Sequence, residues 1–234
     1  MIGAVLGAGS GLVNTRVPSP FSAVAEGITL VVLLSEFAML RAPLSRSQIR
    51  LYSFQSLAVT ALAAYVAAAR GIPDLYILAA LSLGLKVIVV PFVILRLLDD
   101  ARVELVASNR LSVATMTLLA IGLAVFAIFV LGSLPVHSHS LPAAAFGLSA
   151  AVILVAFLLV IVRSDVVSQA VGFFSLENGV SVASLVVAAG LPLVVEVAFL
   201  FDLLVAVVVF GVLMRVHHGR TDTLSTEILD KLKG

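Results

Sequence analysis

Seven long apolar runs follow one another along the chain, separated by charged residues, proline or glycine. They cover residues 20–40, 50–69, 75–98, 113–132, 142–162, 168–189 and 193–215. A helix needs roughly 20 apolar residues to cross about 30 Å of hydrocarbon, and each run is of about that length. The pattern predicts an all-α integral membrane protein with about seven transmembrane helices.

The runs group into larger units. We expect an N-terminal tail (1–19), a first three-helix unit (20–110), a linking helix with an outer loop (111–141), a second three-helix unit (142–216) and a C-terminal tail (217–234). A weak repeat relates the two three-helix units, with Gln55 matching Glu177 and Lys86 matching Asp202. Duplication of a three-helix unit explains it, and chance similarity between apolar helices is the alternative.

Lys and Arg are concentrated in alternate loops, which predicts the orientation in the membrane. One side would carry little beyond Arg16 and Arg70. The other would carry Arg41, Arg46, Arg50, Arg96, Arg102, Arg110, Arg163, Arg215, Arg220, Lys231 and Lys233. Positive residues favour the cytoplasmic side, so we expect the N-terminus outside and the C-terminus in the cytoplasm, as an odd number of crossings requires.

Composition agrees with a membrane protein and narrows the chemistry. Hydrophobic residues make up 62% of the 234 residues and charged residues only 12%, with a net charge of +1. A nucleic-acid partner is not expected, because the basic residues form no clustered patch. The chain has no cysteine, so it can hold no thiolate-ligated iron–sulfur cluster and no covalent haem of its own. We therefore expect no cofactor and no catalysis on this chain.

Three charged residues fall near the middle of apolar runs: Lys86, Glu177 and Asp202. Such groups cost about 2.5–3.5 kcal/mol each at bilayer depth, so they usually face a protein interior or a water-filled path. One interpretation is a proton relay through Glu177, Asp202 and Lys86. The other is that Lys86 pairs with Asp202 or Glu177 as a structural ion pair that fixes helix register.

Several neighbours are candidate accessories. Asn178 lies beside Glu177, and Ser181 lies one turn further on the same helix face. Gln55 belongs to a polar stripe with Gln48 and Tyr52, a pattern typical of interhelical hydrogen bonds. Proline at position 91 removes an N–H and so leaves a carbonyl one turn earlier for water or a neighbouring donor.

Two further carboxyl groups have weaker assignments. Glu36 lies near the cytoplasmic end of its run, where the spacing favours an interfacial salt bridge with Arg41 over transport. Glu196 lies at the outer end of the last run, where we expect it to be solvated, with an entry or exit role as the alternative.

No metal site is expected. His137 and His139 fall in an outer loop, and His217 and His218 fall in the tail. Neither pair brings the three or four convergent ligands that a metal centre needs.

From about residue 45 onward the chain resembles the hydrogenase-4 component E family, the membrane subunits of formate hydrogenlyase-type complexes. The resemblance rests on "YSFQSL", "KVIVVPFVI", "LENG", "FLFDLLVAVVVF" and "DTLSTEILDKLKG", in that order. In that family the C-terminal half, here the last three helices, is similar to subunit K of respiratory complex I. There, two buried glutamates on consecutive helices carry protons. Glu177 matches the first by motif, and Asp202 matches the second by position with a shorter side chain.

The resemblance implies a proton or ion path in a cell membrane of the bacterial or archaeal type. It also implies antiporter-like membrane subunits and a peripheral nickel–iron hydrogenase-type arm as partners. Two alternatives remain open: a subunit of a multi-component cation/proton antiporter, and a purely structural membrane scaffold.

Overall fold

The computed structural model describes residues 19–100, 111–135, 141–142 and 144–187, and the elements in these ranges are all helices. They are α1 (Pro20–Arg41), α2 (Ser45–Arg70), α3 (Pro73–Ser82), η1 (Leu83–Val89), α4 (Val90–Asp100), α5 (Val113–Phe126), η2 (Ala127–Leu131), α6 (Ala144–Val162) and α7 (Val166–Val187). The segments η1 and η2 are π-helical.

Six helices of this part are long and apolar enough to cross a membrane: Pro20–Arg41, Ser45–Arg70, Pro73–Arg96, Val113–Leu131, Ala144–Val162 and Val166–Val187. Their length and composition make the chain a multi-pass membrane protein. These helices confirm the first six predicted runs to within a few residues. The predicted seventh helix, residues 193–215, lies outside the described residues, as do the tails 1–18 and 217–234.

Local sequence explains where several helices begin and end. The Ser19 side chain accepts a hydrogen bond from the Ser22 amide, and Pro20 occupies the first turn, so α1 begins there. Ser112 caps α5 in the same way. Gly71 ends α2 with φ +67°, a left-handed conformation that glycine adopts without steric cost.

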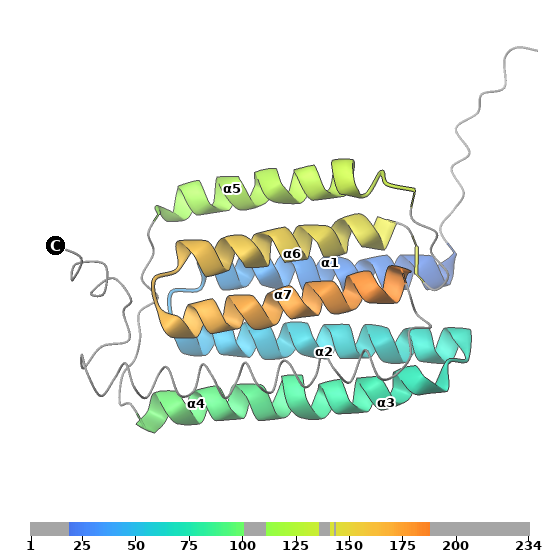
Figure 1. Ribbon diagram of the computed structural model, residues 1–234, viewed down its shortest axis with the longest axis horizontal. Coiled ribbons are helices and arrows are strands. Elements are labelled where there is room, and N and C mark those ends of the chain that lie inside the picture. The colour runs from blue at the N-terminus through green and yellow to red at the C-terminus, as the bar shows by residue number, and fades with distance from the viewer. Residues whose placement is uncertain (1–18, 101–110, 136–140, 143, 188–234) are drawn as a thin grey trace, which may run out of the picture.

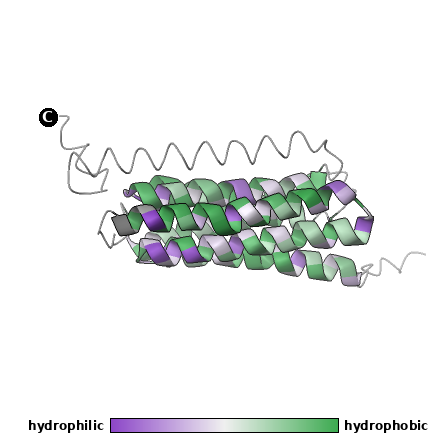
Figure 2. Ribbon diagram, turned by 90° about the horizontal axis from the view of Figure 1, so that it is seen from below, coloured by the Kyte–Doolittle hydropathy of each residue, from purple (hydrophilic) through white to green (hydrophobic). Residues whose placement is uncertain are grey.

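Helices α1, α2, α6 and α7 form the centre of the bundle (Figure 1). The continuous helix α3–η1–α4 packs against the outer side of α2, and α5 packs against α6. Hydrophobic residues dominate these helices along their length (Figure 2). Whether the two halves of the bundle arose by duplication stays a prediction.

Helices α6 and α7 approach closely at two glycines. A Cβ atom on Gly172 would lie 2.9 Å from Val160 Cγ2, and one on Gly179 would lie 2.8 Å from Ile153 Cγ1. Real Cβ atoms rarely come so close, so any larger residue would push the two helices apart. The glycines therefore set the position of α7, which carries Glu177.

The helix that carries Lys86 departs from α-helical geometry. Lys86 lies within the π-helical segment η1, and Pro91 follows it. Proline lacks the N–H that would bond to the Val87 carbonyl, and the Ser53 hydroxyl of α2 donates to that carbonyl at 3.0 Å. The prediction that Pro91 leaves a carbonyl for a neighbouring donor is confirmed.

Candidate functional site

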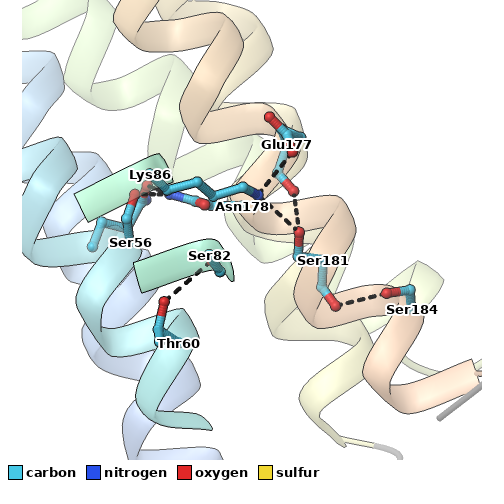
Figure 3. Close-up of polar contacts among 9 residues, drawn as sticks. Ser56, Thr60, Ser82, Lys86, Glu177, Asn178, Ser181 and Ser184 are labelled. Atoms are coloured by element: carbon cyan, nitrogen blue, oxygen red, sulfur yellow. Dashed lines mark hydrogen bonds and ion pairs between the residues drawn. The ribbon is translucent and has the colours of Figure 1, made fainter. Parts of the chain in front are cut away.

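Lys86 and Glu177 form a salt bridge between η1 and α7, with 2.8 Å between Lys86 Nζ and Glu177 Oε1 (Figure 3). The side chains are 3% and 14% exposed. Lys86 Nζ also donates to the Ser181 hydroxyl at 3.3 Å, and that hydroxyl donates to the Glu177 backbone carbonyl at 2.9 Å. Of the two partners expected for Lys86, the structure brings Glu177 to it. Asp202 lies outside the described residues.

A cavity of about 40 Å³ adjoins this ion pair. It lies between α2, α3, η1 and α7, and its polar lining comes from Thr60, Ser82, Lys86, Glu177, Ser181 and Ser184. Thr60 and Ser82 both line the cavity, and the Thr60 hydroxyl donates to the Ser82 hydroxyl at 3.2 Å (Figure 3). A water molecule needs about 10–15 Å³ of such volume and two to four polar partners, so the cavity has room for water beside the charges.

A second polar cluster lies deeper, between α1, α2 and α7. The Gln55 Nε2 group donates to Glu36 Oε2 at 2.9 Å and to the Val32 carbonyl at 3.2 Å. The Ser175 hydroxyl lies within hydrogen-bond distance of both Glu36 Oε2 and Gln55 Oε1. Asn178 Nδ2 donates to Gln55 Oε1 at 3.0 Å and to the Ser56 hydroxyl at 2.9 Å.

All five side chains of this cluster, Glu36, Gln55, Ser56, Ser175 and Asn178, are fully buried. Asn178, a member of this cluster, is the residue after Glu177 on α7, so the cluster lies next to the ion pair (Figure 3). The site therefore has a charged part beside a cavity and a second part, packed inside the bundle, where none of the described residues contributes a cation.

A third polar cluster closes the bundle where α1 ends and α7 begins. Arg163 Nη2 donates to the carbonyls of Leu40 and Ala42 at 2.8 and 3.0 Å. The Asp165 carboxylate accepts from the Ser168 amide at 2.7 Å, and the Ser168 hydroxyl donates to Gln48 Oε1 at 2.6 Å. These contacts join α1, α2 and α7 at one end.

Burial shifts the pKa of both ionisable groups in this third cluster, Asp165 and Arg163. Desolvation raises the pKa of the Asp165 carboxyl above its ordinary value, although the Ser168 bonds and Arg163 oppose that change. Desolvation also lowers the pKa of the Arg163 guanidinium, against the attraction of Asp165.

The structure gives the predicted accessory residues different contacts. Gln48 and Gln55 make interhelical hydrogen bonds, as their stripe predicted, because Gln48 donates to the Met39 and Ala42 carbonyls and Gln55 to Glu36. Ser181 contacts Lys86, and Asn178 joins the buried cluster. Glu196 lies outside the described residues.

The predicted interfacial salt bridge of Glu36 with Arg41 is wrong. Glu36 is fully buried and its hydrogen-bond partners are Gln55 and Ser175, whereas Arg41 is exposed. Five residues correspond to about 140° of rotation around an α-helix, which puts the two side chains on different faces. The prediction considered only that Glu36 lies near the end of its helix in the sequence, and not on which face of the helix its side chain lies.

The sequence pattern did not predict the contacts of Ser168 and Ser175. They lie seven residues apart on α7, and each contacts one of the glutamines that lie seven residues apart on α2, Gln48 and Gln55. This matched spacing on two apolar helices is a signal that could have identified both contacts.

Within the described ranges, no three His, Asp or Glu side chains come together as metal ligands do. His137, His139, His217 and His218 lie outside those ranges.

No family model matches the chain, and no solved structure matches it. Over 173 residues it is 30% identical to the protein named "Uncharacterized protein Rv0085" of Mycobacterium tuberculosis. The match covers 72% of this chain and 77% of the mycobacterial protein. The chain therefore belongs to the same family as Rv0085.

Proposed function

We propose that this chain is a membrane subunit of a complex I-like redox complex of the hydrogenase type. In this role it contributes buried charged residues to a proton path and links a peripheral redox arm to antiporter-like membrane subunits. It holds no redox centre, and it lies in a cell membrane with the N-terminus outside and the C-terminus in the cytoplasm.

The observation that carries this proposal is the Lys86–Glu177 pair beside a cavity with room for water. Both residues lie near the middle of membrane-spanning helices, where an ionisable group is costly unless it has a partner or handles charge. Carboxylate and amine side chains beside space for water, inside the membrane-spanning part of a protein, are the kind of groups that form proton relays. Serine hydroxyls in the cavity lining extend the polar surface from Glu177 towards Ser184.

The geometry favours H⁺ over Na⁺ as the ion handled at this pair. A Na⁺ ion would be coordinated by Glu177 together with hydroxyl oxygens, and Lys86 Nζ lies in that place with 2.8 Å to the carboxylate and 3.3 Å to Ser181. The ammonium group therefore competes with any metal cation. A proton needs no such space.

The same pair also fits a structural scaffold, which is the second candidate function. A closed salt bridge between η1 and α7 fixes the register of two helices without moving any ion. A subunit of a multi-component cation/proton antiporter is the remaining alternative.

Two experiments distinguish these functions. The first is affinity purification of the tagged chain from its native membrane, with its partners identified by mass spectrometry and the metal content measured. We expect antiporter-like subunits together with a partner that contains nickel or iron. Antiporter subunits without such a metal-containing partner would favour the antiporter.

The second experiment measures proton translocation by the purified complex in vesicles. Glu177→Gln removes the titratable carboxyl, and Glu26→Gln makes the same chemical change near the start of α1. We expect translocation to be lost in the first variant, with subunit composition unchanged, and to be kept in the second. Normal translocation by an assembled Glu177→Gln complex would leave only the scaffold.

A further inference from the structure

Glu36 differs from Glu177 in that none of the described residues places a cation against it. Its side chain is fully buried on α1 and makes no salt bridge with a Lys, Arg or His of the described ranges. Its Oε2 atom meets Gln55 and Ser175, and its Oε1 atom has no hydrogen-bond partner among the same residues. Within the described part of the chain, a carboxylate in that position would be a buried charge with neither a counter-ion nor a full set of donors.

The orientation of the Gln55 amide is fixed by the backbone. Its Nε2 group lies 3.2 Å from the Val32 carbonyl, which can only accept a hydrogen bond. One amide proton therefore points to Val32, and the other points to Glu36 Oε2 at 2.9 Å. The opposite end of the amide, Gln55 Oε1, can act only as an acceptor.

The protons available at Ser175 are too few for an ionised Glu36. The Ser175 oxygen lies within hydrogen-bond distance of Glu36 Oε2 and 2.8 Å from Gln55 Oε1. Two such contacts between oxygen atoms need two protons, and the hydroxyl supplies one. With Glu36 ionised, one pair of oxygens would face each other without a proton.

We propose that Glu36 is a neutral carboxylic acid that donates its proton to Ser175. Ser175 then donates to Gln55 Oε1, which also accepts from Asn178, and every contact in the cluster has one donor and one acceptor. This assignment concerns one proton within the chain, so it does not depend on the proposed function.

The amides of Gln55 and Asn178 separate Glu36 from the ion pair. A side-chain amide donates and accepts hydrogen bonds, but it does not readily take up and pass on a proton as a carboxyl, amine or water does. Glu36 is therefore a positioning residue: it orients Gln55 and, through Gln55, Asn178 beside Glu177.

The titratable groups on the elements around Glu36 agree with this assignment. Besides Glu26 and Arg41 on α1 itself, they are Arg46, Arg50, Tyr52, Tyr65 and Arg70 on α2, Glu177 on α7 and Lys86 on η1, and α5 and α6 carry none. Lys86 makes its salt bridge with Glu177, and Arg163 Nη2 donates to the carbonyls of Met39, Leu40 and Ala42, so among the described residues neither cation is paired with Glu36.

Infrared spectroscopy of the purified full-length chain in lipid tests the proposal. A neutral carboxylic acid has a C=O stretching band well separated from the bands of a carboxylate. We expect such a band at neutral pH in the wild type, its loss in Glu36→Gln and its persistence in Glu26→Gln. Identical spectra of the wild type and Glu36→Gln in this region would overturn the proposal.

A second variant keeps the test decisive if Glu36→Gln does not fold. Ser175→Ala removes the proposed acceptor of the Glu36 proton, so the carboxylic acid band should shift in frequency. A band that stays at the same frequency in Ser175→Ala, or that disappears in Glu177→Gln, would show that the neutral acid is not Glu36 and would overturn the assignment.

Discussion

Arg163, at the end of α6, donates a hydrogen bond of 2.8 Å to the carbonyl oxygen of Leu40, at the end of α1. The last carbonyls of a helix have no partner within that helix, and a guanidinium group can satisfy several of them at once. The two residues are 123 positions apart in sequence. A side chain between α6 and α7 therefore caps the first helix of the bundle.

Replacing Arg163 with lysine should destabilise the protein. Lysine keeps the charge, but its ammonium is more strongly hydrated than a guanidinium, so it is less suited to the buried position in which Arg163 Nη2 meets the Leu40 and Ala42 carbonyls. We expect a loss of about 1.5–3 kcal/mol in the free energy of unfolding, measured by circular dichroism in mixed micelles. Arg50→Lys, at an exposed position, is the control. Equal stability of the two variants would show that the cap contributes nothing.

Single substitutions in the Lys86–Glu177 pair should cost more than the double substitution. Either Lys86→Met or Glu177→Gln leaves a largely buried group without its partner, at about 3–5 kcal/mol. Removing both together eliminates the unpaired charge. A double-mutant cycle on unfolding free energies measures the coupling. Strictly additive effects would mean that the two groups do not interact.

Asp165→Asn should remove part of the pH dependence of stability. Burial raises the pKa of the Asp165 carboxyl in the folded state, so folding favours its neutral form. That contribution to stability is complete below the unfolded pKa and is lost as the pH rises through the folded pKa. Asparagine stays neutral and can still cap α7.

The wild type should therefore lose stability relative to Asp165→Asn as the pH rises from about 4, the ordinary pKa of aspartate. Thermal unfolding at a series of pH values, at constant ionic strength, gives this difference. A wild type that gains stability relative to the variant over the same range would reverse the sign and contradict the prediction.

Gly179→Ala should destabilise the contact between α6 and α7. The new methyl group would lie 2.8 Å from Ile153 Cγ1 and 3.1 Å from the Ile153 backbone nitrogen, which cannot easily move. Overpacking of this kind costs about 1–3 kcal/mol. The control is Gly122→Ala on α5, where nothing lies within 4 Å and alanine should stabilise the helix by up to about 1 kcal/mol. Opposite signs of the two changes in unfolding temperature are expected.

The chain has no cysteine, so single cysteines can report its orientation. In the proposed orientation Ser133, which is exposed between α5 and α6, faces outward, and Pro43, which is exposed between α1 and α2, faces the cytoplasm. A membrane-impermeant thiol reagent added to intact cells should label Ser133→Cys and not Pro43→Cys. Labelling of Pro43→Cys alone would invert the topology.

The sequence by itself determined the helical class of the protein and most of its membrane-spanning segments. Apolar runs of sufficient length must become helices in lipid, because no water is present there to bond to the backbone. The sequence also identified Lys86 and Glu177, because a charge within such a run is conspicuous. The sequence also predicted that Pro91 leaves a backbone carbonyl free for another donor, because proline lacks an N–H whatever its surroundings.

Only the tertiary structure decided which of these groups meet. Helical periodicity tells which residues share a face, but helices that are apolar nearly all round give little indication of how each is rotated in the bundle. That rotation turned Glu36 inward to Ser175 and away from Arg41. It also brought Lys86 to Glu177 and placed Arg163 over the end of α1. Such contacts depend on the close packing of all the central helices together, which no single segment encodes.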